Sequence, residues 1–306
     1  MTGAGSATVA YTVEDEFGEG PGTDPTWRQP FIDISVGSLP VEQALERSRQ
    51  PDDPTPAGSR PGNWEGALDI TGTLTDAHWH DLAFADGGTA LPNEPMMAPS
   101  ATWYLGVTLP DGSDEPRTPT GAIVPSASVN IEQGQDTTVD LTILYGFEPD
   151  EDDRDFDLPS TIEQPSDEDA YAWHGASFEV DGMGQSLMQS ATLDLSGLAR
   201  FRRGMSRHPH SAVVDAIEPS FTTDATFTER DQLALAVDDT QDDGVVGKVP
   251  ATVSLENGQG ETIEYSLEDC QPNSYDWNNL VAPDDDLSEP ISYHVADVEA
   301  TVTGAE

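Results

Sequence analysis

The chain has 306 residues, of which 58 are acidic and 12 are basic, so its formal net charge is −46 at pH 7. This balance excludes a protein that grips nucleic-acid phosphates, because such a protein needs clustered lysine and arginine. The single cysteine, Cys270, excludes an intrachain disulfide framework. At molar salt the Debye length falls to about 3 Å and screens the self-repulsion of this charge. The composition therefore predicts adaptation to concentrated salt, and the regular strand patterns below argue against a disordered acidic chain.

The start of the chain carries neither a basic segment nor an apolar one, so we expect no signal peptide. No apolar run approaches the roughly 20 residues that a membrane-spanning helix needs. We therefore expect synthesis in the cytoplasm and no membrane partner.

Alternating apolar and polar residues predict four short strands in the first half, each with one buried face. Between the second and third of these, residues 46–62 form a polar loop rich in arginine and proline. Long loops of this kind are usually functional or disordered, and we expect this one either to project as an ordered arm or to lie extended across a neighbour. The predicted strands cover residues 9–13, 31–36, 68–74 and 102–107.

The segment after the third strand changes its period. Its apolar residues are spaced as on one face of a helix, so we expect a short amphipathic helix with His78 and His80 on its polar face. A threonine or an aspartate at its start can cap it. Gly72, in the preceding strand, predicts a bulge. The apolar residues are Trp79, Leu82 and Ala83, and the capping candidates are Thr75 and Asp76.

Residues 121–146 hold the clearest pattern in the chain. Two runs with one apolar and one polar face flank a four-residue link at 133–136 that contains Gly134, as in an antiparallel hairpin. The apolar set is Ile123, Ala127, Val129 and Ile131, then Val139, Leu141, Ile143 and Tyr145; the polar set includes Ser126, Ser128, Asn130, Asp140 and Thr142.

Beyond an acidic, proline-rich stretch the order of elements in the first half recurs. A strand at 191–196 is followed by an arginine loop at 200–209, a strand at 221–227, a helical spacing at 233–237, a hairpin at 253–267 and a last strand from 291 whose phase shifts near Ala296. The phase shift predicts a bulge. We predict an internal duplication, with a first β half at 1–147, a linker or loop at 148–170 and a second β half at 171–306, the halves packed as one structural unit.

The motifs of enzymes and metal sites are weak here. Residues 153–157 resemble the start of a calcium loop but lack its glycine and its final bidentate acid. The histidine pairs at 78/80 and 208/210 have no third ligand nearby, and a pair of carboxylates means little among 58 acidic residues. We therefore expect no catalytic residues, no metal and no cofactor, and we interpret the chain as a structural protein and not an enzyme.

The scarce cations are the more informative residues. Eleven arginines accompany one lysine, and several of the arginines gather in the two corresponding loops, where Ser206-Arg207-His208-Pro209 matches Ser48-Arg49-Gln50-Pro51. They either relieve local charge or pair, through both guanidinium nitrogens, with carboxylates of a neighbouring subunit. The predicted interface residues are Arg47, Arg49, Arg202, Arg203 and Arg207.

These features together resemble the tail tube proteins of long-tailed prokaryotic viruses. The resemblance extends over nearly the whole chain and depends on the order of elements more than on signature residues. Its parts are the early strand ending in Glu14-Asp15-Glu16-Phe17-Gly18, the Arg49-Gln50-Pro51 loop, the strand and helix at 68–84, the hairpin at 121–146, and the second strand set ending at Val302.

The resemblance implies two packed antiparallel sheets, as a β-sandwich or barrel with short flanking helices. It also implies hexameric rings stacked into a virion tail, assembled in the host cytoplasm, with tape-measure and terminator proteins as partners and viral DNA passing through the lumen. The acidity points to a haloarchaeal host. The alternatives are another virion component, such as a tail terminator or a capsid decoration, and a halophilic surface β-sandwich that binds carbohydrate.

Overall fold

The computed structural model describes residues 7–49, 56–93, 97–109, 113–185, 187–228, 230–237, 247–281 and 286–304. This part of the chain is mainly β, as predicted, with one 16-stranded antiparallel sheet, two two-stranded sheets and two short α-helices. It does not close into a barrel by itself. None of its helices is long and apolar enough to cross a membrane.

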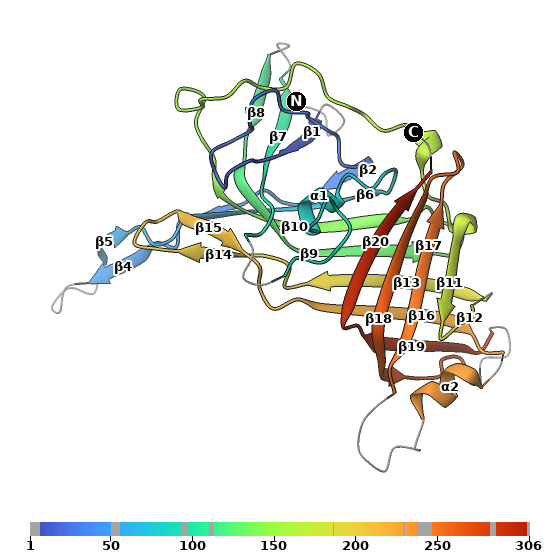
Figure 1. The fold of residues 1–306 in the computed structure, drawn as a ribbon. Helices are drawn as coiled ribbons and strands as arrows, with labels where there is room; N and C mark the ends of the chain where they lie inside the picture. Colours follow the sequence, from blue (N-terminus) through green and yellow to red (C-terminus); the bar gives the residue numbers. More distant parts are fainter. Residues whose placement is uncertain are drawn as a thin grey trace.

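Six long strands side by side form the central layer (Figure 1). The strands of the predicted 121–146 hairpin lie in its middle, and strands of the second half continue the layer on one side. A broken edge strand, β2 (Ile32–Val36) followed by β3 (Val41–Glu42), lines the other side. In spatial order the six are β6 (Glu65–Thr73), β10 (Thr138–Phe147), β9 (Thr120–Glu132), β13 (Met188–Ser196), β16 (Glu218–Thr226) and β19 (Ser288–His294).

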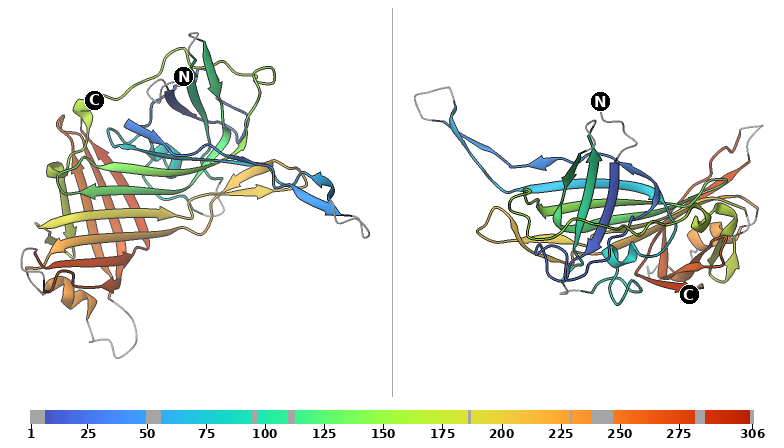
Figure 2. Two further views of the ribbon diagram at one scale, coloured as in Figure 1. Left: turned by 180° about the vertical axis from the view of Figure 1, so that it is seen from behind. Right: turned by 90° about the horizontal axis from the view of Figure 1, so that it is seen from above.

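Two smaller groups of strands cross the central layer steeply (Figure 1, Figure 2). One forms where β18 leaves the layer: its second half pairs with β19, and its first half pairs with β17 and β20. The other group forms around β7, which touches β9 at its start. The first group is β11 (Ala176–Val180), β12 (Met183–Gly184), β17 (Val249–Glu256), β18 (Thr262–Tyr275) and β20 (Asp297–Thr303); the second is β1 (Ala7–Val13), β7 (Ala101–Thr108) and β8 (Asp114–Arg117).

Both arginine loops are two-stranded hairpins that point away from the body on the same side (Figure 2). The first therefore forms the projecting arm that the sequence predicts. The remaining elements are short helical turns. The hairpins are β4 (Glu46–Arg49) with β5 (Pro56–Arg60) and β14 (Arg200–Arg203) with β15 (Pro209–Val213); the helices are α1 (His80–Ala83), α2 (Asp231–Ala236), η1 (Asp167–Asp169) and η2 (Trp173–Gly175).

An unbroken apolar row crosses the central layer and confirms the predicted face of the hairpin. Its members lie opposite one another in the strand register and are buried on the side that the steep strands cover. Such cross-strand contacts stabilise a sheet most when both neighbours are large and dry. The row therefore unites the two halves in one core. It consists of Val139, Val129, Leu193, Phe221 and Tyr293.

A buried carboxylate fixes the start of β9. Glu14 accepts hydrogen bonds from Ser100 Oγ at 2.8 Å and Thr102 Oγ1 at 2.7 Å, and also from the backbone N–H groups of Gly18 and Gly121. Gly121 has a φ of +60°, which glycine adopts without strain. Because a buried charge needs several donors, Glu14 holds together three segments that the sequence alone does not connect.

The expectations about residues 72–80 are met in part. A register shift lies opposite Gly72, but in β2: Ile32 pairs with Thr73 and Ser35 with Thr71, whereas Gly72 pairs regularly with Val139 on its other side. A Cβ at Gly72 would lie 2.4 Å from Phe31, so close packing also favours the glycine. The helix is only the single turn α1 without a side-chain cap, because Asp76 accepts from the His78 N–H in a local turn. His80 is buried and lies 2.9 Å from the Tyr265 hydroxyl, so it faces the core and not solvent.

The phase shift near Ala296 is confirmed as the break between β19 and β20, but the bulge predicted from it is wrong. His294 pairs with Gln271 and Asp297 with Glu268, so the register against β18 continues without an extra residue. The two strands follow the same edge of β18, and the Ala296 N–H donates to the Glu268 carbonyl at 3.0 Å where they meet. The division at 148–170 and the origin of the halves by duplication stay predictions.

The two faces of the hairpin give a first test. Replacing Val129 by Asp places an unpaired charge in the dry row, so we expect the free energy of unfolding to fall by about 3 kcal/mol or more. Thr142→Asp adds the same charge on the exposed face and should change it by less than about 0.5 kcal/mol. Urea unfolding in multimolar salt measures both variants, and equal losses would contradict the face assignment.

His80 gives a pH test. Burial lowers the pKa of His80 to about 3, below the value of roughly 6.5 for an unfolded chain. The unfolded state therefore binds the extra proton as the pH falls from 6.5 towards 3, and folding stability is lost over that window. Relative to His80→Phe, the wild-type free energy of unfolding should fall more steeply between pH 6 and pH 4, by about 1.4 kcal/mol per pH unit. Parallel slopes would mean that His80 stays accessible to protons.

Candidate assembly surface

The face of the central layer opposite the core is built from small polar side chains. Hydroxyl, carboxylate and imidazole groups follow one another across six strands in register. None of these strands contains a lysine or an arginine. The surface is therefore continuous, hydrated and negative, and we call it the wet face. One of its rows is Thr71, Asp140, Ser128, Asp194, Ser220 and His294.

Hydrogen bonds between strands fix the side chains of the wet face. Ser128 Oγ donates to Asp194 Oδ1 at 2.6 Å, across the boundary between the two halves. Asn130 Nδ2 donates to Asp140 Oδ2 at 2.7 Å, and Thr71 Oγ1 donates to the other oxygen of Asp140. Because these carboxylates are held by neutral donors, their negative charge is positioned and not neutralised.

The predicted arginines fall into two groups. Arg203 and Arg207 bind the base of the first arm: Arg203 pairs with Glu65 and donates to the Trp64 carbonyl, and Arg207 Nε donates to the Gly62 carbonyl at 3.1 Å. Arg202 lies on β14 beside Arg203. In contrast, Arg47 is exposed on β4, and Arg49 ends that strand with a side chain outside the described part of the structure. Contacts with another copy of the chain remain a prediction for all five.

His208 adds to the contact between the second hairpin and the first half. Its Nδ1 lies 2.8 Å from the Gly146 carbonyl, and its ring stacks on Phe147 with centroids 5.2 Å apart. Together with Arg203 it attaches β14 and β15 to the ends of β6 and β10. The second hairpin therefore contacts the first half through its tip, that is, through the turn between β14 and β15 and the residue before it.

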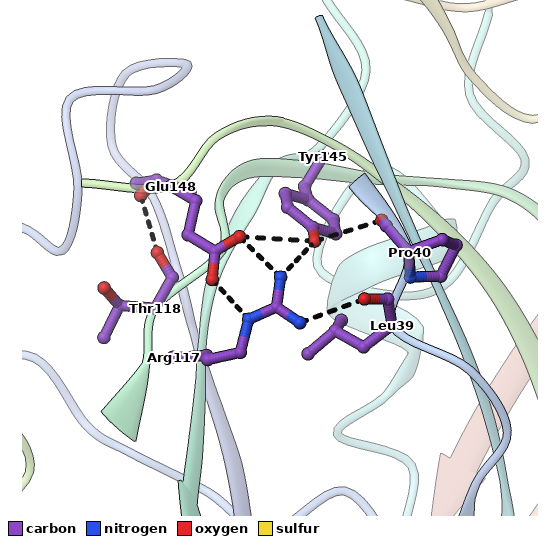
Figure 3. A network of polar contacts seen from close by, with 7 residues as sticks. Leu39, Pro40, Arg117, Thr118, Tyr145 and Glu148 are labelled. Carbon is purple, nitrogen blue, oxygen red and sulfur yellow. Dashed lines mark hydrogen bonds and ion pairs between the residues drawn. The ribbon is translucent and has the colours of Figure 1, made fainter. Parts of the chain in front are cut away.

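A network around Arg117 was not predicted from the sequence (Figure 3). Its guanidinium binds both oxygens of Glu148, at 2.5 and 2.7 Å, and also donates to the Leu39 carbonyl at 2.9 Å and the Tyr145 hydroxyl at 3.0 Å. Burial and the nearby Glu148 carboxylate raise the pKa of Tyr145 to about 12. The hydrogen bond to the Leu39 carbonyl ties the segment between β2 and β3 to the body, and the bidentate pair with Glu148 orients the guanidinium that makes it.

Comparison with protein families matches residues 5–301 to the family described as phage tail tube protein. The chain belongs to the phage tail tube protein family. Comparison with curated proteins gives no match. A tail tube protein is a structural component of the virion that assembles with itself into a tube and associates with other tail components, and the family is not one of enzymes.

Within the residues that the structure describes, no group of three or more His, Cys, Asp or Glu side chains is arranged to hold a metal ion. Cys270 is buried and carries no disulfide. The features that distinguish this tail tube protein are therefore its surfaces: the wet face, the sheet edges and the two hairpins.

The arginine hairpins give a test of assembly. Arg49→Glu places a negative charge on the first hairpin, and Arg207→Glu places one in the turn of the second. At both positions we expect the native arginine to meet a carboxylate of the next subunit. Breaking a partly buried pair costs about 3–5 kcal/mol, so rings should fail to form while the circular dichroism spectrum stays native. Arg154→Glu, the same charge change in the acidic loop, is the control. Normal tubes from both reversal variants would return these arginines to local charge relief.

Proposed function

We propose that this tail tube protein forms stacked rings of six-fold symmetry, and that the lumen of the stack conducts viral DNA to the host cell. The wet face carries the proposal. It extends over six described strands that contain no lysine or arginine, and most of its side chains are short. Duplex DNA carries one charge per roughly 1.7 Å of its axis, so a lining of fixed carboxylates offers it no place to bind.

Salt modifies this repulsion without abolishing it. At molar salt the screening length is about 3 Å, which is shorter than the gap between a lumen wall and the DNA axis. Long-range repulsion is then weak, and the carboxylates act mainly by denying phosphate contacts at close approach. The lining is therefore best described as non-adhesive.

The edges of the sheet support closed rings. An exposed strand edge invites pairing with another chain, and head-to-tail rings satisfy such edges without leaving free ends. The two hairpins project beyond the body on one side (Figure 2), where they can reach a neighbouring subunit or the next ring.

The charge balance supports a haloarchaeal host. With 58 acidic residues against 12 basic ones, subunits in dilute buffer repel one another strongly. In a host cytoplasm rich in salt that repulsion is screened, and the same surface stays hydrated. We therefore place assembly in such a cytoplasm, with tape-measure and terminator proteins as further tail partners.

Electron microscopy of the purified chain tests this function. In multimolar salt we expect tubes with a continuous central channel, and dialysis to dilute buffer should dissolve them because subunit repulsion is then unscreened. Tubes that survive dialysis would contradict the halophilic interpretation. A chain that stays monomeric at every salt concentration would overturn the tube itself.

The lining is tested by adding cations to it. Thr142→Lys combined with Thr222→Lys places ammonium groups on the wet face, and virions assembled from this variant should eject DNA more slowly than wild type. Thr142→Gln with Thr222→Gln is the size-matched neutral control. Equal ejection rates for both variants would show that the wet face does not line the channel.

A further inference from the structure

We propose that each chain supplies two equivalent units of the tube wall, and that rings close when the β2–β3 edge of one chain pairs with the second half of β18 in the next. This inference depends on the proposed function, since it specifies how the ring is joined. A wall of six units then contains three chains, so the six-fold symmetry of the proposed ring relates its wall units, and the chains themselves are related by three-fold symmetry.

The two halves share a pairing scheme that goes well beyond the order of their elements. Apart from β8, which lies beside β7 and has no counterpart beside β17, the strands of the first unit's sheet pair with one another as their counterparts do in the second unit, always antiparallel. Such agreement over several long-range pairings is not expected of unrelated segments. The matching pairs are β1·β7 with β11·β17, β2·β6 with β13·β16, β6·β10 with β16·β19, β10·β9 with β19·β18, and β7·β9 with β17·β18.

The hairpins and helices repeat as well. In the first hairpin the register shifts just before Arg49, which pairs with Pro56; in the second it shifts just before Arg203, which pairs with Pro209. Arg203, and not Arg207, thus occupies the position of Arg49. The strands that follow are both nine residues long and begin with glutamate. Finally, α1 packs against β9 and α2 packs against β18.

Inside the chain, one joint connects the two units. β9 is held at Ala122 by β7, and further along the same edge it pairs with β13, from Ser126 opposite Ser196 to Glu132 opposite Ser190. The joint begins at Pro125, whose carbonyl accepts a hydrogen bond from the Leu198 N–H at 3.0 Å. Strand β13 of the second unit therefore pairs with the outer edge of β9, the outermost strand of the first unit.

In the second unit the outermost strand of the central layer is β18, the counterpart of β9, and the corresponding edge of β18 has no partner among the described strands. β17 holds one edge of β18 as far as Cys270, and beyond that point no described strand pairs with this edge. Pro272 lies one position before the counterpart of Pro125 in β9, and the two strands have a positive φ at matching positions: +54° for Asp269 and +60° for Gly121. A proline without an N–H is thus tolerated at the start of the internal joint, and the outer edge repeats it.

The complementary edge lies at the other end of the layer. β2 and β3 line β6 as β13 lines β16, and no described strand covers their outer side. Arg117 holds this edge in place through the Leu39 carbonyl. Apolar side chains are partly exposed at both edges: Val41 and Trp277 are each 39 % exposed, whereas Leu193 inside the internal joint is only 2 % exposed.

The internal register predicts the contacts of the new joint. Glu42 corresponds to Ser196, because each pairs with the first glutamate of the next long strand, Glu65 or Glu218. Ser274 corresponds to Ser126 by the same comparison, since their partners Ser292 and Thr142 occupy matching positions. Because Ser196 lies opposite Ser126, Glu42 of one chain lies opposite Ser274 of the next. Within the chain Arg203 pairs with Glu65. Because Arg49 corresponds to Arg203 and Glu218 to Glu65, we expect Arg49 to pair with Glu218 of the adjacent chain.

Cysteine cross-linking counts the chains. The variant carries Glu42→Cys and Ser274→Cys in a Cys270→Ala background, and it is oxidised as assembled tubes in multimolar salt. On a non-reducing denaturing gel we expect a ladder that stops at three times the 32.8 kDa mass of one chain. Each single-cysteine variant, which cannot build a chain of cross-links, is the control and should stop at a dimer.

The outcomes separate the two proposals. Tubes whose ladder reaches six chains would overturn two units per chain, and tubes that never cross-link would overturn the joint. A chain that forms no tubes fails the proposed function, and the joint falls with it. An independent readout uses charge reversal: Glu218→Arg should block tube formation, and Arg49→Glu in the same chain should restore it at least tenfold by tube yield. Failure of the double variant to recover would overturn the Arg49–Glu218 pair.

Discussion

The backbone pairing of β9 with β13 is the constraint on which the rest of this structure depends. A central strand must satisfy its N–H and C=O groups on both edges, and this joint does so where the two halves meet. It aligns Val129 with Leu193 on the dry side and Ser128 with Asp194 on the wet side. One register therefore produces both the common core and the continuous polar face.

Much of the fold could be predicted because strand alternation is a local property. The hairpin at 121–146, the arm at 46–62 and the shift near Ala296 all follow from short-range patterns. The long-range contacts could not be predicted in the same way. Nothing near Glu14 in the sequence indicates that it meets Ser100 and Gly121, and the burial of His80 depends on Tyr265, which lies far along the chain.

The candidate surface could likewise be predicted only in part. The scarcity of cations in the composition indicated that the arginine loops are important. The carboxylate that each arginine faces, however, depends on the strand register, which the composition does not contain. The structure also shows which strands contain no cations. Arg203, Arg207 and Arg117 join segments of the chain to one another, whereas the six central strands contain neither lysine nor arginine. These three arginines thus connect separate segments, and the wet face is left without positive charge.

The acidic segment at 148–170 occurs once between two similar halves. In a wall with two units per chain, it can decorate only alternate positions around the circumference. The outside of the tail would then have half the rotational order of the inside, so a receptor-facing or solvent-facing feature could change by mutation while the channel kept its smooth, near-uniform bore. Joining two wall units in one polypeptide separates the evolution of the tail's exterior from the geometry that DNA encounters.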